Sequence, residues 1–234
     1  MRLILFDIDG TLLTSNGAGI ATLAFALQEI FGTTGSIDRV DFAGKTDPSI
    51  ITEILSTAGI DGSRIQAELH RIYEHMAHSA LDIFPTRGVM PCSGVPQLLD
   101  ELQQRPDVIL GLVTGNNHLT GPLKLASAGI APELFRVAAF GSDAADRNRL
   151  PSIAMERARE LTGYPFKGAQ TVVVGDTPAD IECARHCGAT AVAVATGRFD
   201  YQTLAVHSPD FCFDTLVDTP RVLGALLKEQ VVAQ

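Results

Sequence analysis

Short runs of apolar residues recur along the chain, and most of them lack the polar–apolar alternation of a sheet with one face in water. Continuous runs of this kind are typical of parallel strands that are covered on both faces. We predict buried strands over residues 3–6, 108–113, 137–140, 171–174, 191–195 and 211–213.

Segments with helical spacing of apolar residues separate these runs. We predict helices over about residues 94–104, 119–128, 151–162, 178–187 and 220–229. Pro151 and Pro178 stand near the start of their segments, where the first turn of a helix accepts proline. The alternation of strands and helices predicts an α/β fold with a doubly wound, Rossmann-like parallel sheet.

The stretch from residue 15 to residue 87 breaks this alternation. It has helical patterns at about 17–31, 47–58 and 63–80 and no convincing strand. We predict a small helical domain inserted after the first strand, with residues 1–14 and 88–234 forming the α/β core. Gly, Pro and small polar residues predict hinges near 14–17 and 84–91, and we expect the last residues, 231–234, to be frayed.

Composition and charge narrow the class of protein. The chain has 234 residues, 46% hydrophobic and 19% charged, which is ordinary for a globular protein. Its net charge of −9 argues against nucleic acid as a partner, although a local cationic pocket could still bind a small anion. The apolar runs are too short for a membrane span, and the one at the start is too short for a signal peptide. We therefore expect a cytoplasmic protein with no membrane partner.

Acidic residues follow the first predicted strand in the sequence Asp7-Ile8-Asp9-Gly10-Thr11. Sites in open α/β sheets form at the carboxyl ends of the strands. Two acids at this place offer a nucleophile and a neighbouring acid/base. Taken alone, the segment is equally consistent with a capped turn, because Asp and Gly are common turn residues.

A second acidic pair, Asp176 and Asp180, follows the predicted strand 171–174 and opens a helix. A helix N-cap explains one of these acids without any function, but it does not explain two strand-end acid clusters in one chain. Carboxylates that converge from two strands are suited to a hard divalent cation such as Mg²⁺.

Thr114-Gly115-Asn116 also follows an apolar strand. Its hydroxyl and backbone N–H groups could hold phosphoryl oxygens. A simple turn is the alternative interpretation of this motif.

Together, D-x-D-G-T, T-G-N and G-D-x-x-x-D occur in an order that resembles the haloacid dehalogenase-like hydrolase superfamily over nearly the whole chain. The chain looks most like the branch of phosphoglycolate phosphatase-like and β-phosphoglucomutase-like proteins. The helical insertion resembles the cap of that superfamily. The stretch 42–47, with Lys45, resembles a G-[RK]-T-D motif on the cap that faces the substrate.

The resemblance implies a role for each matching residue. Asp7 matches the nucleophile that forms an aspartyl-phosphate, and Asp9 matches the acid/base that protonates the leaving oxygen and activates water. The remaining matches concern the metal and the phosphate. They imply Mg²⁺ held by Asp7, the backbone carbonyl of Asp9 and Asp176, with Asp180 in or near that shell, and phosphate held by Thr114 and the backbone of Gly115 in a loop shaped by Asn116.

One departure concerns the lysine that the family places before the helix preceding the last motif. The segment 146–152 has no Lys. An arginine can supply the charge and can bind phosphate with two donors. Arg147 is the first candidate by spacing and Arg149 the second, and solvated surface charge is the alternative for either. We interpret Lys124, on the helix after Thr114, as structural or supporting.

The resemblance predicts a Mg²⁺-dependent phosphatase acting on a small phosphorylated metabolite, such as phosphoglycolate or a sugar phosphate. A phosphomutase of the β-phosphoglucomutase type is the alternative, because it uses the same motifs. A non-catalytic binding protein on the same fold is a lesser alternative, left open by the absent lysine.

Overall fold

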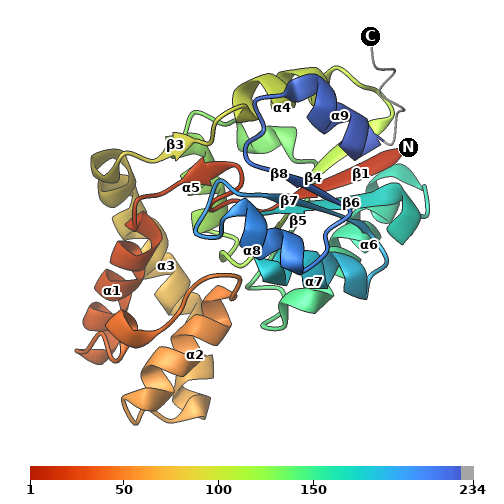
Figure 1. The fold of residues 1–234 in the computed structure, drawn as a ribbon. Helices are drawn as coiled ribbons and strands as arrows, with labels where there is room; N and C mark the ends of the chain where they lie inside the picture. Colours follow the sequence, from red (N-terminus) through yellow and green to blue (C-terminus); the bar gives the residue numbers. More distant parts are fainter. Residues whose placement is uncertain (228–234) are drawn as a thin grey trace.

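Six parallel strands form the centre of the molecule (Figure 1). The structure is a computed structural model and describes residues 1–227. The strands are β1 (Arg2–Phe6), β4 (Val108–Thr114), β5 (Val137–Phe140), β6 (Thr171–Gly175), β7 (Thr190–Val194) and β8 (Phe211–Phe213). Their order in the sheet is β5–β4–β1–β6–β7–β8. The predicted α/β fold and its six strands are confirmed, with ends that agree within a residue.

Each face of the sheet has its own apolar layer, because neighbouring residues of a strand point to opposite sides. Ile4 and Phe6 belong to one buried cluster, and Leu3 and Leu5 belong to the other. The helices α4 (Val95–Gln103), α5 (Thr120–Ser127) and α9 (Thr219–Leu227) contribute to the first cluster; α6 (Leu150–Thr162), α7 (Pro178–His186) and α8 (Tyr201–Val206) contribute to the second.

Three helices within residues 15–87 stand to one side of the sheet (Figure 1). They are α1 (Ala18–Phe31), α2 (Asp47–Thr57) and α3 (Gly62–Arg87). Their facing sides bury an apolar cluster of their own, which includes Leu23, Ile51 and Ile72. We call residues 15–87 the insertion. Two short antiparallel strands, β2 (Leu13–Thr14) and β3 (Met90–Pro91), pair where the chain enters and leaves it.

The last helix of the insertion is longer than predicted. It continues through Pro85 to Arg87, so residues 84–87, predicted as part of a hinge, are helical. Phe84 is 1% exposed within an apolar cluster of the sheet, which anchors this turn. Proline has no N–H to donate to the carbonyl four residues earlier in a helix. That carbonyl belongs to Leu81, which is 62% exposed, so water can reach its surroundings. The irregular segment therefore begins at Gly88, whose φ is 70°.

Other predicted helices agree with the structure except at two places. Helix α8 was not predicted, and the predicted helix 220–229 is described only to Leu227. The predicted fraying of residues 231–234 lies outside the described residues. Within residues 1–227, no helix is both long enough and apolar enough to cross a bilayer.

Candidate active site

Three strand ends bring the predicted motifs together. Asp7 follows β1, Thr114 ends β4, and Asp176 follows β6. Since β1 lies between β4 and β6 in a parallel sheet, these ends meet at one edge, the place where α/β sheets form their sites. They line a cavity of about 310 Å³, with Asp9 and Arg147 beside them and residues of the insertion on the other side.

A cluster of three buried carboxylates lies at the base of this cavity. Each of Asp7, Asp176 and Asp180 offers an oxygen atom within 4.8 Å of the others. The Thr11 hydroxyl donates to Asp176 at 3.1 Å. The N–H and hydroxyl of Thr177 donate to Asp180 Oδ2 at 3.0 and 2.7 Å, so this carboxylate also closes the first turn of α7. Asp180 is therefore held by the first turn of its own helix, and Asp176 by a hydroxyl from the loop after β1.

Glycines make room for these carboxylates. A Cβ atom on Gly197 would lie 1.7 Å from Asp176 Oδ2, and one on Gly10 would lie 2.3 Å from the same oxygen. Gly10 also has a φ of 79°, which L side chains rarely adopt. Gly197 belongs to the loop after β7, which the sequence motifs did not include. Its only sequence signal is a Thr-Gly-Arg turn after an apolar strand.

Arg147 reaches this cluster from the short 3₁₀ turn η3 (Arg147–Arg149). Its Nη2 lies 2.5 Å from Asp180 Oδ1 and 3.3 Å from Asp7 Oδ2. The side chain is buried, and its Nε–H has no hydrogen-bond partner among the described residues. Arg149 is exposed and lines a different hollow with Glu156. Of the two candidates, the structure brings only Arg147 to the strand ends.

Charge at the cluster is unbalanced. Three carboxylates face one guanidinium, so when all three are ionised they carry two negative charges more than the cation beside them in the described residues balances. Burial raises the pKa of Asp7 to about 6, against the opposing pull of Arg147. Burial and the neighbouring Asp180 and Asp7 raise the pKa of Asp176 well above its ordinary value. A buried carboxylate set with this excess charge fits a hard divalent cation.

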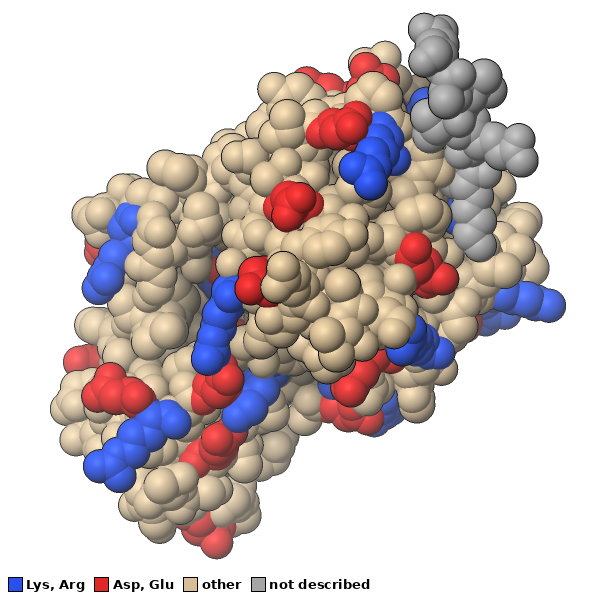
Figure 2. Space-filling model, in the orientation of Figure 1, with Lys and Arg blue, Asp and Glu red and all other residues tan. Residues whose placement is uncertain are grey.

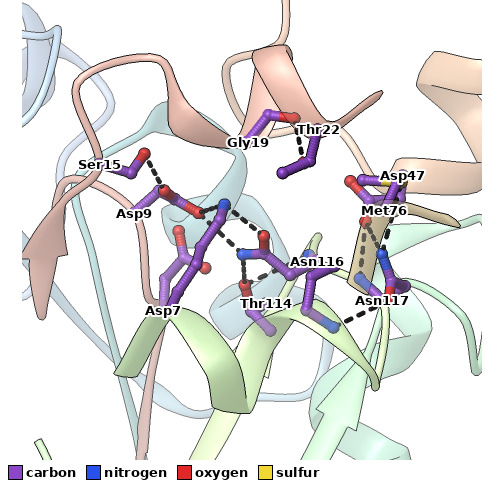
Figure 3. A network of polar contacts seen from close by, with 12 residues as sticks. Asp7, Asp9, Ser15, Gly19, Thr22, Asp47, Met76, Thr114, Asn116 and Asn117 are labelled. Atoms are coloured by element: carbon purple, nitrogen blue, oxygen red, sulfur yellow. Dashed lines mark hydrogen bonds and ion pairs between the residues drawn. The ribbon is translucent and has the colours of Figure 1, made fainter. Parts of the chain in front are cut away.

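Asp9 lies above Asp7 in a network of hydrogen bonds (Figure 3). Its Oδ1 accepts from the Ser15 hydroxyl at 2.7 Å, and its Oδ2 accepts from Asn116 Nδ2 at 2.8 Å and Lys124 Nζ at 2.6 Å. Burial acts to raise the pKa of Asp9, but Lys124 and these donors outweigh it and the pKa is lowered. Asp9 is thus held as a carboxylate.

Lys124 is the nearest cation to Asp9. Its side chain is 6% exposed, and its Nζ also donates to Asn116 Oδ1 at 2.6 Å. Gly19 leaves space for this ammonium, because a Cβ there would lie 2.9 Å from Nζ. Lys124 supports the site, in line with its interpretation from sequence, but its direct contact with Asp9 was not predicted.

The Thr114–Asn116 loop faces the cavity beside these acids. Thr114 Oγ1 accepts from Asn116 Nδ2 at 2.8 Å, which links the two predicted phosphate-binding side chains (Figure 3). A Cβ on Gly115 would lie 2.0 Å from the carbonyl oxygen of Lys45. The insertion therefore touches the core at the one residue of this loop that has no side chain.

Further contacts hold the insertion against the core. The Asp47 carboxylate accepts from the backbone N–H and the side-chain amide of Asn117, both at 2.7 Å. The Thr46 hydroxyl donates to the carbonyl of Ala145 at 2.7 Å. Charged side chains of both signs lie along this boundary on the face drawn in Figure 2. The G-K-T-D stretch thus includes two residues, Thr46 and Asp47, that dock the insertion.

Lys45, the predicted substrate contact on the insertion, lines the cavity. Its Nζ pairs with Glu53 at 2.5 Å, and the two side chains are 34% and 46% exposed. Such exposed pairs contribute little free energy and exchange readily, so the ammonium stays available to an anion in the cavity.

Comparison with known proteins agrees with this geometry. The family description "Haloacid dehalogenase-like hydrolase" matches residues 4–194, most of the chain, and the protein belongs to this family. It is therefore a hydrolase by family, and the resemblance seen in the motifs is confirmed.

Particular relatives are similar over nearly their whole length. A phosphoglycolate phosphatase from Synechococcus elongatus is 30% identical over 229 residues, which cover 98% of this chain and 100% of that protein. Pyrophosphatase PpaX from Bacillus pumilus is 26% identical over 222 residues, 95% of this chain and 96% of the other. A hydrolase from Pseudomonas syringae has the same fold, with a TM-score of 0.69 at 18% identity over 95% of this chain and 98% of that one.

Proposed function

We propose that this protein is a Mg²⁺-dependent phosphatase that hydrolyses a small phosphorylated metabolite through an aspartyl-phosphate on Asp7. One observation carries the proposal: Asp7 is buried beside Arg147 and within 4.8 Å of two further carboxylates at the edge of the sheet. A carboxylate nucleophile is repelled by a phosphate dianion unless cations lie beside both. The names of the relatives support the same class of reaction.

Asp7, Asp176 and Asp180, with the backbone carbonyl of Asp9, are the groups proposed to hold the cation. When bound, Mg²⁺ would neutralise phosphoryl oxygens and lower the repulsion between them and the nucleophile. Arg147 adds a fixed positive charge at Asp7, and its Nε–H, which has no partner within residues 1–227, is a further donor. Thr114 and the Gly115 backbone are proposed to hold the remaining phosphoryl oxygens.

Asp9 is proposed as the acid and then the base. Asp7 attacks phosphorus, the ester P–O bond breaks, and the leaving oxygen takes a proton from Asp9. Asp9 then takes a proton from the water that cleaves the aspartyl-phosphate, which releases phosphate and restores Asp7. Lys124 and Asn116 hold the carboxylate form, which the second step needs. To act first as the acid, Asp9 exchanges one of these contacts for the leaving oxygen.

Residues 15–87 are proposed to serve as the cap over this site. They supply one side of the cavity and dock on the Thr114–Asn117 loop. Closing a lid over a phosphoryl-transfer site excludes bulk water and selects the leaving group.

The test is release of phosphate from a panel of small phosphate esters and pyrophosphate, in the presence of Mg²⁺ and of EDTA. We expect turnover that needs Mg²⁺ and that Asp7→Asn lowers by at least about a thousandfold, since the amide is no nucleophile. Circular dichroism of the variant controls for folding. Equal turnover by wild type and Asp7→Asn would contradict the proposal. Transfer of label between positions of a sugar phosphate, without phosphate release, would replace it with a mutase.

A further inference from the structure

The side of the cavity that faces away from the carboxylates is apolar. We call this side the roof; it consists of Ile20, Leu23, Phe42, Ile50 and Met76, all from the insertion. Ile20 is 43% exposed, so its side chain is available to a molecule that enters. Apolar walls with a few placed polar groups are typical of sites for small organic ligands.

Polar side chains near the roof are already engaged. The Ser15 hydroxyl donates to Asp9, and Asp47 accepts two hydrogen bonds from Asn117. Lys45 is paired with Glu53, and its ammonium would exchange this partner for an anion rather than for a neutral hydroxyl. A ligand rich in hydroxyls would lose its hydrogen bonds to water here and find few partners in exchange.

Thr120 is the exception. It is the first residue of α5, it lines the cavity, and it is 1% exposed. Its hydroxyl has no hydrogen-bond partner in the part of the chain that the structure describes. By contrast, the hydroxyl of Thr22, another buried threonine, donates to the Gly19 carbonyl at 2.8 Å (Figure 3). Buried polar groups without a partner are rare in native proteins and call for an explanation.

We infer that the Thr120 hydroxyl binds the alcohol part of the substrate, and that this alcohol is short and largely apolar, with one hydrogen-bonding group. The inference rests on the proposed phosphatase function. The cavity of about 310 Å³ stands at the small end of ligand sites, which span roughly 300–1,000 Å³, and it must also hold the phosphoryl group. One free hydroxyl under an apolar roof matches one polar group on a short chain.

Three esters test this inference in the presence of Mg²⁺: butyl phosphate, 3-hydroxypropyl phosphate and glucose 6-phosphate. The first two have chains of equal length and differ in one terminal hydroxyl. We expect kcat/KM for 3-hydroxypropyl phosphate to exceed that for glucose 6-phosphate by at least about tenfold, because unpaired polar groups discriminate strongly in a closed site.

Variants of Thr120 sharpen the test. Thr120→Val keeps the shape and removes the hydroxyl, and it should lower the ratio of kcat/KM for 3-hydroxypropyl phosphate to that for butyl phosphate by about tenfold. Thr120→Ser should keep the ratio within about threefold. The matched control is Thr22→Val, which removes a buried hydroxyl that is bonded within its own helix and should leave the ratio unchanged.

Each outcome decides something. A preference of the wild type for glucose 6-phosphate overturns the inference without any variant, and so does an unchanged ratio in Thr120→Val; in both cases phosphate is released and the proposed function stands. If no phosphate is released from any of the three esters, the inference is overturned, and the result counts against the proposed function as well.

Discussion

The two sides of the cavity differ in the way they are built. The floor, which we define as Asp7, Arg147 and Asp176, is charged and buried, and its acids come from segments that follow strands of the sheet. Asp180 does not line the cavity and pairs with Arg147. The roof is apolar, comes from the insertion, and includes the half-open side chain of Ile20. The floor admits little change, because losing Arg147 would remove the cation that these buried carboxylates share. The roof tolerates change, since one apolar side chain replaces another at little cost.

This difference assigns separate tasks to the two sides. Substitutions in the floor should affect turnover of every ester, whereas substitutions in the roof should change the order in which esters are preferred. Substitutions at the contact between the core and the insertion, at Gly115 and Lys45, should affect both turnover and preference.

The largest effect is expected at Arg147. Within residues 1–227, Arg147 is the one cation that pairs with Asp7. Arg147→Gln removes it and should lower kcat/KM for all esters by at least about a thousandfold. Arg149→Gln is the matched control two residues away; its exposed side chain lies outside the cavity, and the change should be less than about twofold. Steady-state phosphate release measures both, and similar losses in the two variants would contradict the assignment of Arg147 to the floor.

Gly115→Ala tests the contact between the core and the insertion. The added Cβ would meet the Lys45 carbonyl 2.0 Å away, so the insertion would have to move outward. We expect kcat/KM to fall by about 10- to 100-fold, because small displacements from the reactive geometry are costly. Gly62→Ala is the control, since nothing lies within 4 Å of its added Cβ. Wild-type kinetics in Gly115→Ala would show that the contact is not needed for turnover.

Asp176→Asn should separate stability from activity. Without divalent cations at about pH 7, losing one crowded buried carboxylate should raise the free energy of unfolding by about 1–2 kcal/mol, while phosphate release is lost. The pKa values of Asp7 and Asp176 are raised in the folded state. At these two carboxyl groups the folded state therefore holds more protons than the unfolded chain, and their contribution to stability falls as pH rises from about 4 through their raised pKa values.

Urea unfolding in EDTA at about pH 5 and about pH 7.5 measures this effect. The decline in stability should be shallower in Asp176→Asn than in the wild type. Asp143→Asn is the control with the opposite sign, because Asp143 pairs with Arg157 at 2.7 Å and its pKa is lowered. Equal declines in wild type and Asp176→Asn would refute the charge imbalance.

The smallest effect is expected at Lys45. Its pair with Glu53 is exposed, so Lys45→Gln should lower kcat/KM for phosphoglycolate relative to butyl phosphate by only about two- to fivefold. Glu53→Gln frees the ammonium and should change that ratio in the other direction. A ratio unaffected by either variant would remove Lys45 from the list of substrate contacts.

Much of the fold was predictable because the strands are apolar on both faces. Helix α8 was not predicted because it is too short to show a helical pattern. It has six residues, of which only Leu204 is buried, and its other large aliphatic residue, Val206, is 82% exposed. A helix was predicted only to about residue 80, with a hinge near 84–91, and the packing of Phe84 against the sheet shows why the helix continues to Arg87.

The acids of the site were predictable from local spacing, but their supporting residues were not. Arg147 and Arg149 are two residues apart in a 3₁₀ turn. Spacing ranked Arg147 first, but only the structure shows that its side chain reaches Asp7 and Asp180. Lys124 reaches Asp9 across 115 residues of sequence separation. Thr120 and Gly197 carry no motif; their places in the cavity depend on tertiary packing alone.

The ribbon formed by β2 and β3 has a further consequence. The chain leaves the core at Leu13–Thr14 and returns at Met90–Pro91, and these two crossings are hydrogen-bonded neighbours. Everything between them can be exchanged as a single module without cutting the sheet. A chimera that carries this module from a relative would keep the reaction of its core and take on the substrate preference of that relative. The condition is that the new module contacts Gly115 through its backbone, as Lys45 does here.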